Sequence, residues 1–146
     1  MKTSTSGGRN RLFRRLMGWI NTAPHDNTTM EDWIGYKDEI LGRIGELAKL
    51  SPDTVRGYQT LSGAGAKTGH LDGKTRELIA LAVAATTRCD GCITVHSKAA
   101  LDEGATREEI AEALGVAVAL NAGAALVYSG RILDAVDIHA GGEPSR

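Results

Sequence analysis

Four side chains capable of redox and acid–base chemistry lie between residues 77 and 96. Cys89 and Cys92, the two cysteines of the sequence, stand in a C-x-x-C spacing, and His96 follows the second by four residues. On a helix, a rotation of about 100° per residue would bring these three within roughly 60° of one another on one face. Glu77 precedes Cys89 by twelve residues. Two thiols and an imidazole on one face are the parts of a thiol redox site.

The histidine spacing favours Cys92 as the reactive sulfur. A free cysteine has a pKa near 8.5, so only a few per cent is thiolate at neutral pH. A helix N-terminus and an imidazolium both stabilise the thiolate, and lowering its pKa by two units requires about 2.7 kcal/mol. His96 is four residues from Cys92, the spacing of neighbours on a helix surface. Cys89 is then placed to attack a sulfenic acid or mixed disulfide on Cys92, or to form a disulfide with it.

Other roles are open for the cysteines and the histidines. The cysteines could be small buried hydrophobic residues, or they could bind zinc with His96, His70 or His139. A helical setting and the lack of a second C-x-x-C argue against a structural zinc site. Outside such a site, we expect His70 and His139 to be surface or loop residues.

Glu77 also has a simpler interpretation. It stands in the first turns of an expected helix, close to Lys74 and Arg76. A glutamate in that position can pair with either cation and interact favourably with the helix dipole. The spacing alone therefore does not assign Glu77 to the redox site.

The bulk composition indicates one all-α domain. The chain has 146 residues, of which 42% are hydrophobic, 24% charged and 4% aromatic. Its prolines are at positions 24, 52 and 144, which leaves residues 53–143 without a helix-breaking proline. Two cysteines are too few for a secreted disulfide scaffold and favour an intracellular redox or metal role. We expect a cytoplasmic protein.

The charge is unevenly distributed. Residues 1–29 carry +4, which leaves −5 for the remainder of a chain whose net charge is −1. A mildly acidic body offers no footprint for nucleic acid, and we expect no transmembrane segment. Residues 1–29 are predicted to be a basic, flexible extension, although their amphipathic pattern would also suit a membrane-surface helix. Residues 30–139 are predicted to form the helical domain, and residues 140–146 a loose tail.

The first half of the helical domain shows clear start signals. Thr28 and Glu31 form a capping-box pattern, and Ser51 followed by Pro52 predicts a second helix start. Residues 62–70 are glycine-rich and are expected to be a connection. Apolar residues in between recur at steps of three and four and predict a core-facing stripe: Trp33, Tyr36, Ile40, Ile44 and Leu47.

The second half continues in the same way. Asp72 can cap a helix that is wholly apolar over Leu78–Ala85 and should be buried. Gly104 suits the end of the helix that carries the cysteines. Thr106 and Glu109 begin a last helical region, either continuous or broken near residues 121–123. Its small residues over 113–125, together with helix 78–85, offer more smooth apolar surface than one subunit need bury, which predicts a homo-oligomer.

The combined pattern resembles a known family. Residues 74–83, Lys-Thr-Arg-Glu-Leu-Ile-Ala-Leu-Ala-Val, followed by Cys89-x-x-Cys92-x-x-x-His96, are similar to the carboxymuconolactone decarboxylase superfamily, in its alkylhydroperoxidase D-like branch. The resemblance covers about residues 35–137. The motif of Glu, twelve residues, then Cys-x-x-Cys-x-x-x-His is far more specific than C-x-x-C alone.

The resemblance implies a function and an assembly. It implies an all-helical subunit in trimers or hexamers that reduces hydroperoxides through thiols, without metal or another cofactor beyond the redox-active Cys89–Cys92 disulfide. Cys92 would attack the peroxide and Cys89 would resolve the sulfenic acid. Glu77 and His96, with a water, would relay protons. The reductant in the resembling proteins is a lipoyl-bearing partner.

One position departs from the family pattern. Some members have a second histidine immediately before the second cysteine, where this chain has Gly91. This difference leaves room for a weaker proton relay or another oxidant. We predict a thiol-dependent hydroperoxide reductase. The alternatives are a disulfide-exchange or redox-sensing protein that uses the same pair, and a non-redox enzyme like the lactone decarboxylases, which lack the cysteine pair.

Overall fold

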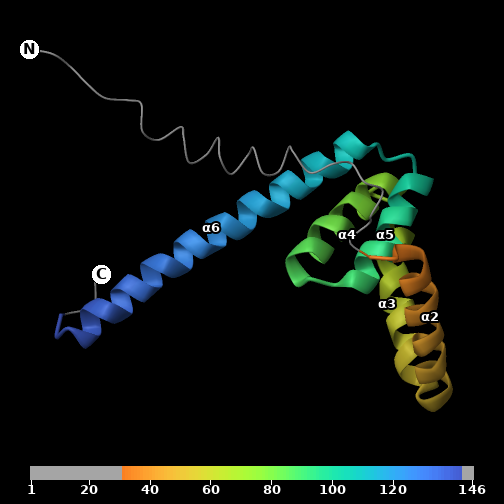
Figure 1. Cartoon of the computed structure of the whole chain (residues 1–146), viewed down its shortest axis with the longest axis horizontal. Helices are drawn as coiled ribbons and strands as arrows, with labels where there is room; N and C mark the ends of the chain where they lie inside the picture. The colour runs from red at the N-terminus through yellow and green to blue at the C-terminus, as the bar shows by residue number, and fades with distance from the viewer. Residues whose placement is uncertain (1–30, 143–146) are drawn as a thin grey trace, which may run out of the picture. The chain divides into compact units, whose positions relative to one another are not determined.

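The computed structural model describes residues 31–142, which form five α-helices and no strand (Figure 1). The all-α prediction is confirmed. The chain divides into two units, Met1–Asp32 and Trp33–Arg146, and the five helices belong to the second. The expectations for residues 1–29, and the capping box begun by Thr28, fall outside the described residues. The helices are α2 (Trp33–Leu50), α3 (Pro52–Thr68), α4 (Gly73–Thr87), α5 (Asp90–Asp102) and α6 (Arg107–His139).

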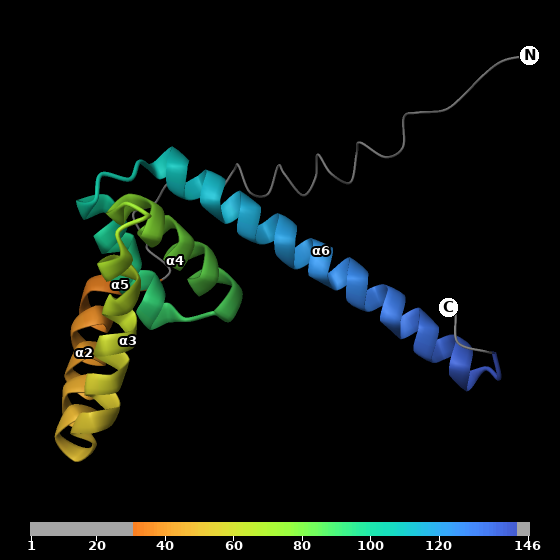
Figure 2. The same ribbon diagram turned by 180° about the vertical axis from the view of Figure 1, so that it is seen from behind.

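Helices α2 and α3 form a hairpin joined by a single residue, Ser51, and lie side by side in both views (Figures 1 and 2). The Ser51 amide donates to the Leu47 carbonyl at 2.8 Å. Pro52 occupies the first position of α3. An N–H at this position has no partner within the helix, so proline, which lacks an N–H, loses no hydrogen bond there. The predicted start is confirmed. The Ser51 hydroxyl pairs with the Thr54 hydroxyl at 2.8 Å and makes no cap to the backbone.

The predicted connection over residues 62–70 is wrong, because α3 continues to Thr68. Glycine inside a helix costs about 1 kcal/mol relative to alanine, which weakens a helix without ending it. Alanines at 64 and 66 alternate with the glycines, and no proline interrupts the run. The helix ends where Gly69 adopts the left-handed conformation, with φ at 70°, which glycine accepts without steric cost.

Helices α4, α5 and the start of α6 build the core of this unit. Asp72 caps α4 as expected, and its Oδ1 accepts the Thr75 amide at 2.7 Å. Burial of the Leu81 side chain stabilises the fold by about 2 kcal/mol. Ala100 is fully buried, and its small side chain allows α5 to approach α4 closely. The cluster consists of Leu81, Ala100 and Ala105, with Leu78 and Ile110 packed against it.

The expectation that residues 78–85 are buried all round holds for one face only. Leu81 and Ala84 are buried, whereas Ile79 and Val83 are 50% and 52% exposed. These two residues are four apart and therefore share a face of α4. Within residues 31–142, that face is about half exposed. The sequence pattern predicted an apolar helix correctly, but it could not show which of its faces the other helices cover.

Helix α6 is continuous over 33 residues, so no break occurs near residues 121–123. It begins with the predicted capping box between Thr106 and Glu109. Asn121 donates from Nδ2 to the Ala117 carbonyl at 2.8 Å, which satisfies its polar side chain along the helix. In both views the second half of α6 continues past α4 and α5 (Figures 1 and 2). By length and composition, α6 is the one described helix that could span a membrane.

An ion pair joins α4 to α6 and predicts a pH dependence of stability. Lys74 Nζ lies 2.7 Å from Glu109 Oε1, a bond that raises the pKa of Lys74 above 10.5 and lowers that of Glu109 below 4.5. A lowered carboxyl pKa contributes stability that is lost as the pH falls through it, and a raised amine pKa contributes stability that is lost as the pH rises through it. We expect Lys74→Met to lower the urea midpoint at pH 7, with the deficit shrinking below about pH 4.

A matched control is available on α5. Lys98 pairs with Asp102 four residues along the same helix, and both side chains are 61% exposed, against 36% for each partner of the Lys74–Glu109 pair. Exposed pairs of this kind contribute little. Lys98→Met should therefore leave the urea midpoint nearly unchanged. Equal effects of the two substitutions, or a Lys74→Met deficit that does not shrink as the pH falls below the ordinary glutamate pKa of 4.5, would contradict the prediction.

Candidate functional site

The turn between α4 and α5 positions the two cysteines. Arg88 has φ at 55°, the one positive φ of a non-glycine residue within 31–142. Its amide and the Cys89 amide both donate to the Ala84 carbonyl, the latter at 3.2 Å. This left-handed residue ends α4 and reverses the chain. Helix α5 then begins at Asp90, so both cysteines lie at its N-terminus.

Cys89 and Cys92 are joined in a disulfide, with their Cα atoms 5.2 Å apart. Cys89 is the N-cap of α5, so it stands just outside the helix that was expected to contain it. Its Sγ accepts the Cys92 amide at 3.1 Å. Cys92 is in the first turn, one helical turn before His96. A helix N-terminus at both sulfurs favours negative charge there once the disulfide is reduced.

Glu77 and His96 meet across α4 and α5. His96 Nδ1 lies 2.7 Å from Glu77 Oε2, and the two side chains are 31% and 22% exposed. The cations near Glu77 in sequence point elsewhere: Lys74 binds Glu109 and Arg76 reaches the Leu71 carbonyl. A hydrogen bond at Nδ1 fixes the orientation of the imidazole and leaves Nε2 free for chemistry. The structure thus brings together all four residues singled out from the sequence, while their chemical roles stay predictions.

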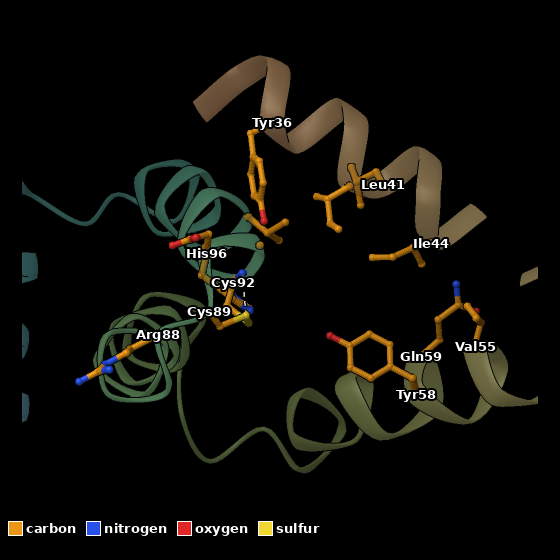
Figure 3. A pocket seen from close by; sticks show the side chains of 14 residues that line it. Tyr36, Leu41, Ile44, Val55, Tyr58, Gln59, Arg88, Cys89, Cys92 and His96 are labelled. Atoms are coloured by element: carbon orange, nitrogen blue, oxygen red, sulfur yellow. Dashed lines mark hydrogen bonds between the residues drawn. A yellow bond between two sulfur atoms is a disulfide. The ribbon is translucent and has the colours of Figure 1, made fainter. Parts of the chain in front are cut away.

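A cavity of about 610 Å³ opens beside the disulfide (Figure 3). His96, Cys89 and Cys92 border it at the α5 end, together with Arg88, whose side chain points away from the labelled tyrosines in Figure 3. This volume falls within the range of small-molecule binding sites. The opposite walls come from α2 and α3 and include Tyr36, Ile40, Leu41, Ile44, Val55 and Tyr58.

The α2 residues in this wall correct the predicted core stripe. Helix α2, which is described in full, has no buried residue. Tyr36 and Ile40 are half-buried, and Ile44 is more exposed. A helix that packs on a core and a helix that lines a cavity both need one apolar face. The same helical period of apolar residues therefore fits either arrangement. Two cavity residues of α3, Tyr58 and Gln59, were not predicted from the sequence. Nothing in their local sequence pattern distinguishes them from surface residues.

The other two described histidines, His70 and His139, do not line the cavity beside the cysteines. His70 borders a separate cavity of about 380 Å³, shared with Thr68 and Arg76. His139 ends α6. In the part of the chain that the structure describes, no three His, Cys, Asp or Glu side chains gather in a group that could hold a metal ion.

The comparison with protein families decides the identity of the fold. The model of the carboxymuconolactone decarboxylase family matches residues 52–135. The chain belongs to this family. The matched range contains Glu77, both cysteines and His96 but not α2. The family resemblance of the sequence is thereby confirmed at the level of the family.

Two bacterial proteins and one solved structure are similar to this chain over most of their length. An uncharacterized protein of Haemophilus influenzae is 49% identical over 107 residues, which cover 73% of this chain and 95% of that protein. An uncharacterized protein of the cox locus of Paracoccus denitrificans is 39% identical, over 64% of this chain and 85% of its own. A crystal structure of a carboxymuconolactone decarboxylase family protein from Legionella pneumophila, in its apo form, has a TM-score of 0.58 and 38% identity, over 70% of this chain and 92% of that one.

Proposed function

We propose that this member of the family is a thiol-dependent hydroperoxide reductase. The observation that supports the proposal is the disulfide between Cys89 and Cys92 at the edge of a cavity that His96 also borders. A redox-active pair needs access to a substrate and a group that manages protons, and both are present in one place. The hydrogen bond between His96 Nδ1 and the Glu77 carboxylate, which accepts it, supplies the orienting contact that an imidazole base requires.

The proposed reaction begins with the reduced pair. The Cys92 thiolate attacks one oxygen of the hydroperoxide, the O–O bond breaks, and Cys92 becomes a sulfenic acid. The leaving alkoxide takes a proton from His96, through a water, and departs as an alcohol. Sulfur loses two electrons and the peroxide gains them. The Cys89 thiolate then attacks the sulfenic sulfur, forming the disulfide and releasing hydroxide, which is protonated to water.

A dithiol reductant closes the cycle. It attacks the Cys89–Cys92 disulfide, passes through a mixed disulfide, and leaves as its own cyclic disulfide. Two electrons and two protons return to the cysteines. In the family that the sequence resembles, the reductant is a lipoyl-bearing protein, so we propose a lipoyl or similar dithiol partner here.

Stopped-flow kinetics tests this function directly. The full-length protein is mixed with dihydrolipoamide and an organic hydroperoxide, and peroxide consumption is followed with and without protein. We expect turnover to depend on protein concentration and to stop when the thiols are alkylated first. Reduction of the disulfide without peroxide consumption would indicate disulfide exchange instead. If both are absent and a lactone substrate is decarboxylated, the redox function is wrong.

We also propose that the protein works as a homo-oligomer, as a trimer or hexamer in line with the family resemblance. Within α6 the buried residue is Ala117. Ten large apolar residues on this helix, from Val116 to Ile138, are 41% to 75% exposed. Soluble monomers rarely expose a continuous apolar surface of this extent. The exposed face of α4 at Ile79 and Val83 adds to it.

Sedimentation velocity at micromolar concentration should show an oligomer. Leu133→Glu, on α6, should dissociate it, because a carboxylate cannot be buried unpaired without a cost of several kcal/mol. Leu50→Glu provides the matched control, since Leu50 at the end of α2 is also an exposed leucine. A stable wild-type monomer, or flotation of the protein with lipid vesicles, would contradict the proposal. Equal dissociation by both substitutions would show that the interface is not specific to α6.

A further inference from the structure

Two tyrosine hydroxyls face the disulfide from across the cavity. Tyr36 of α2 and Tyr58 of α3 line this cavity together with both cysteines and His96. In Figure 3 each ring extends from its own helix into the space between the helices, and its hydroxyl is directed toward the cysteines. A phenolic hydroxyl donates one hydrogen bond and can accept others. The reaction described above uses neither tyrosine, so both hydroxyls are candidates for a further role at the sulfurs.

The ring of Tyr36 is positioned by α5, the helix that carries Cys92. Thr94, a buried residue of α5, donates from its hydroxyl to the Trp33 carbonyl at 2.8 Å and so holds the start of α2. The Trp33 and Tyr36 rings then meet edge to face, with centroids 6.5 Å apart and planes at 84°. Aromatic pairs prefer this arrangement. Movement of the Tyr36 ring is therefore limited by contacts that begin two residues after Cys92.

Tyr58 is held less closely to the redox pair. It is 64% exposed, whereas Tyr36 is half-buried. Helix α2 packs against α5, and α3 packs against α2. A hydroxyl that stabilises a reacting atom has to be in place before the reaction begins, because reorientation during the reaction costs free energy. Of the two tyrosines, Tyr36 meets this requirement better.

The proposed reaction requires a fixed hydrogen-bond donor near Cys92. When the O–O bond breaks, the leaving oxygen develops a negative charge, which donors placed in advance stabilise. His96 supplies the proton through a water, and a second donor would hold the oxygen while that proton arrives. Among the other side-chain donors that line the cavity, Arg88 points away from the tyrosines, and Gln59 lies across the cavity from the cysteines (Figure 3). A tyrosine hydroxyl therefore fits this role best.

We propose that Tyr36 is a catalytic residue whose hydroxyl donates a hydrogen bond to the oxygen that leaves as Cys92 attacks the peroxide. This inference rests on the proposed function and adds a residue to its mechanism. The Cys92 sulfur bonds to one peroxide oxygen, the electron pair of the O–O bond stays on the other oxygen, and His96 supplies the proton that completes the alcohol or water. Sulfur loses two electrons, and the Tyr36 hydroxyl keeps its own proton. Tyr36 precedes residues 52–135, so the match to the family model does not extend to it.

The experiment compares two reagents that both need the Cys92 thiolate. Reduced full-length protein is mixed with hydrogen peroxide, and loss of free thiol is followed, or with iodoacetamide, and the label on Cys92 is quantified by mass spectrometry. The peroxide releases an oxygen that develops negative charge, whereas iodoacetamide releases iodide. Tyr36→Phe keeps the ring and its edge contact with Trp33 but loses the hydroxyl. We expect its rate constant for oxidation to fall by about tenfold or more, and its rate constant for alkylation to stay within about twofold.

The other tyrosines provide the controls. Tyr128 is an exposed residue of α6 that does not line this cavity, so Tyr128→Phe should leave both rate constants unchanged. Tyr58→Phe removes the second hydroxyl, and a loss of oxidation as large as that of Tyr36→Phe would overturn the choice of Tyr36. Equal losses in oxidation and alkylation for Tyr36→Phe would also overturn the proposal, because the hydroxyl would then act on the thiolate or on the fold.

The same measurements separate this inference from the proposed function. If hydrogen peroxide oxidises the wild type and Tyr36→Phe at the same rate, Tyr36 has no catalytic role and the proposed function stands. If the reduced wild type reacts with iodoacetamide but not with hydrogen peroxide, the proposed function fails, and the role of Tyr36 fails with it. A selective loss of oxidation in Tyr36→Phe supports both.

Discussion

Cys92→Ser is expected to abolish peroxide consumption, leaving only the slow background reaction of the reductant. A serine hydroxyl does not ionise near neutral pH and cannot form a sulfenic acid, so neither the attack nor the oxygen transfer can occur. The substitution removes no core contact, because Cys92 is partly exposed at the cavity. Thermal unfolding should therefore match that of the reduced wild type, which separates lost chemistry from lost structure.

Cys89→Ser is the companion variant and should behave differently. It keeps the attacking sulfur but lacks the resolving one, so we expect one equivalent of peroxide to be consumed and turnover to stop. Mass spectrometry after dimedone treatment should find the label on Cys92. The N-cap position gives the Cys89 sulfur its own stabilising bond from the Cys92 amide. A sulfenic acid trapped on Cys89 in Cys92→Ser, with turnover retained, would reverse the assignment of the two sulfurs.

The local signals in the sequence predicted the frame of this site well. Asp72, Pro52 and the Thr106–Glu109 box each mark a helix start that the structure has, because these starts depend on bonds within a few residues. The spacing of Cys92 and His96 follows from the helical period alone. Glu77 needed the family resemblance, since its contact with His96 joins two helices and leaves no mark in the local pattern.

What the sequence could not predict depends on longer distances. The apolar stripe of α2 indicated a buried face, but whether such a face meets a core or a cavity is decided by how α3 and α5 are placed around it. The apolar run at Ile79 and Val83 likewise indicated burial without naming the covering surface. Glycines at 63 and 65 suggested a loop because each glycine adds an entropic cost to helix formation. Helix α3 nevertheless continues to Thr68 and ends where Gly69 adopts the left-handed conformation.

Glu77→Ala and His96→Ala should each slow peroxide reduction by about 10²-fold, the usual contribution of one proton-transfer group. The two side chains touch at 2.7 Å, so they act as a unit. We therefore expect the double variant to lose little more than either single variant, because the second substitution removes a partner that no longer has a function. Stopped-flow values of kcat/KM for the four proteins of this cycle give the coupling directly.

The control and the contradicting outcomes come from the same set of measurements. His70→Ala serves as the matched histidine variant, because His70 borders the other cavity and should leave kcat/KM unchanged. Additive losses in the double variant would mean that Glu77 and His96 act independently, which the 2.7 Å contact does not favour. Full activity in Glu77→Ala together with a strong loss in His96→Ala would remove Glu77 from the relay. Its contact with His96 would then serve only to hold α4 against α5, and a lowered unfolding temperature of Glu77→Ala would be its one measurable effect.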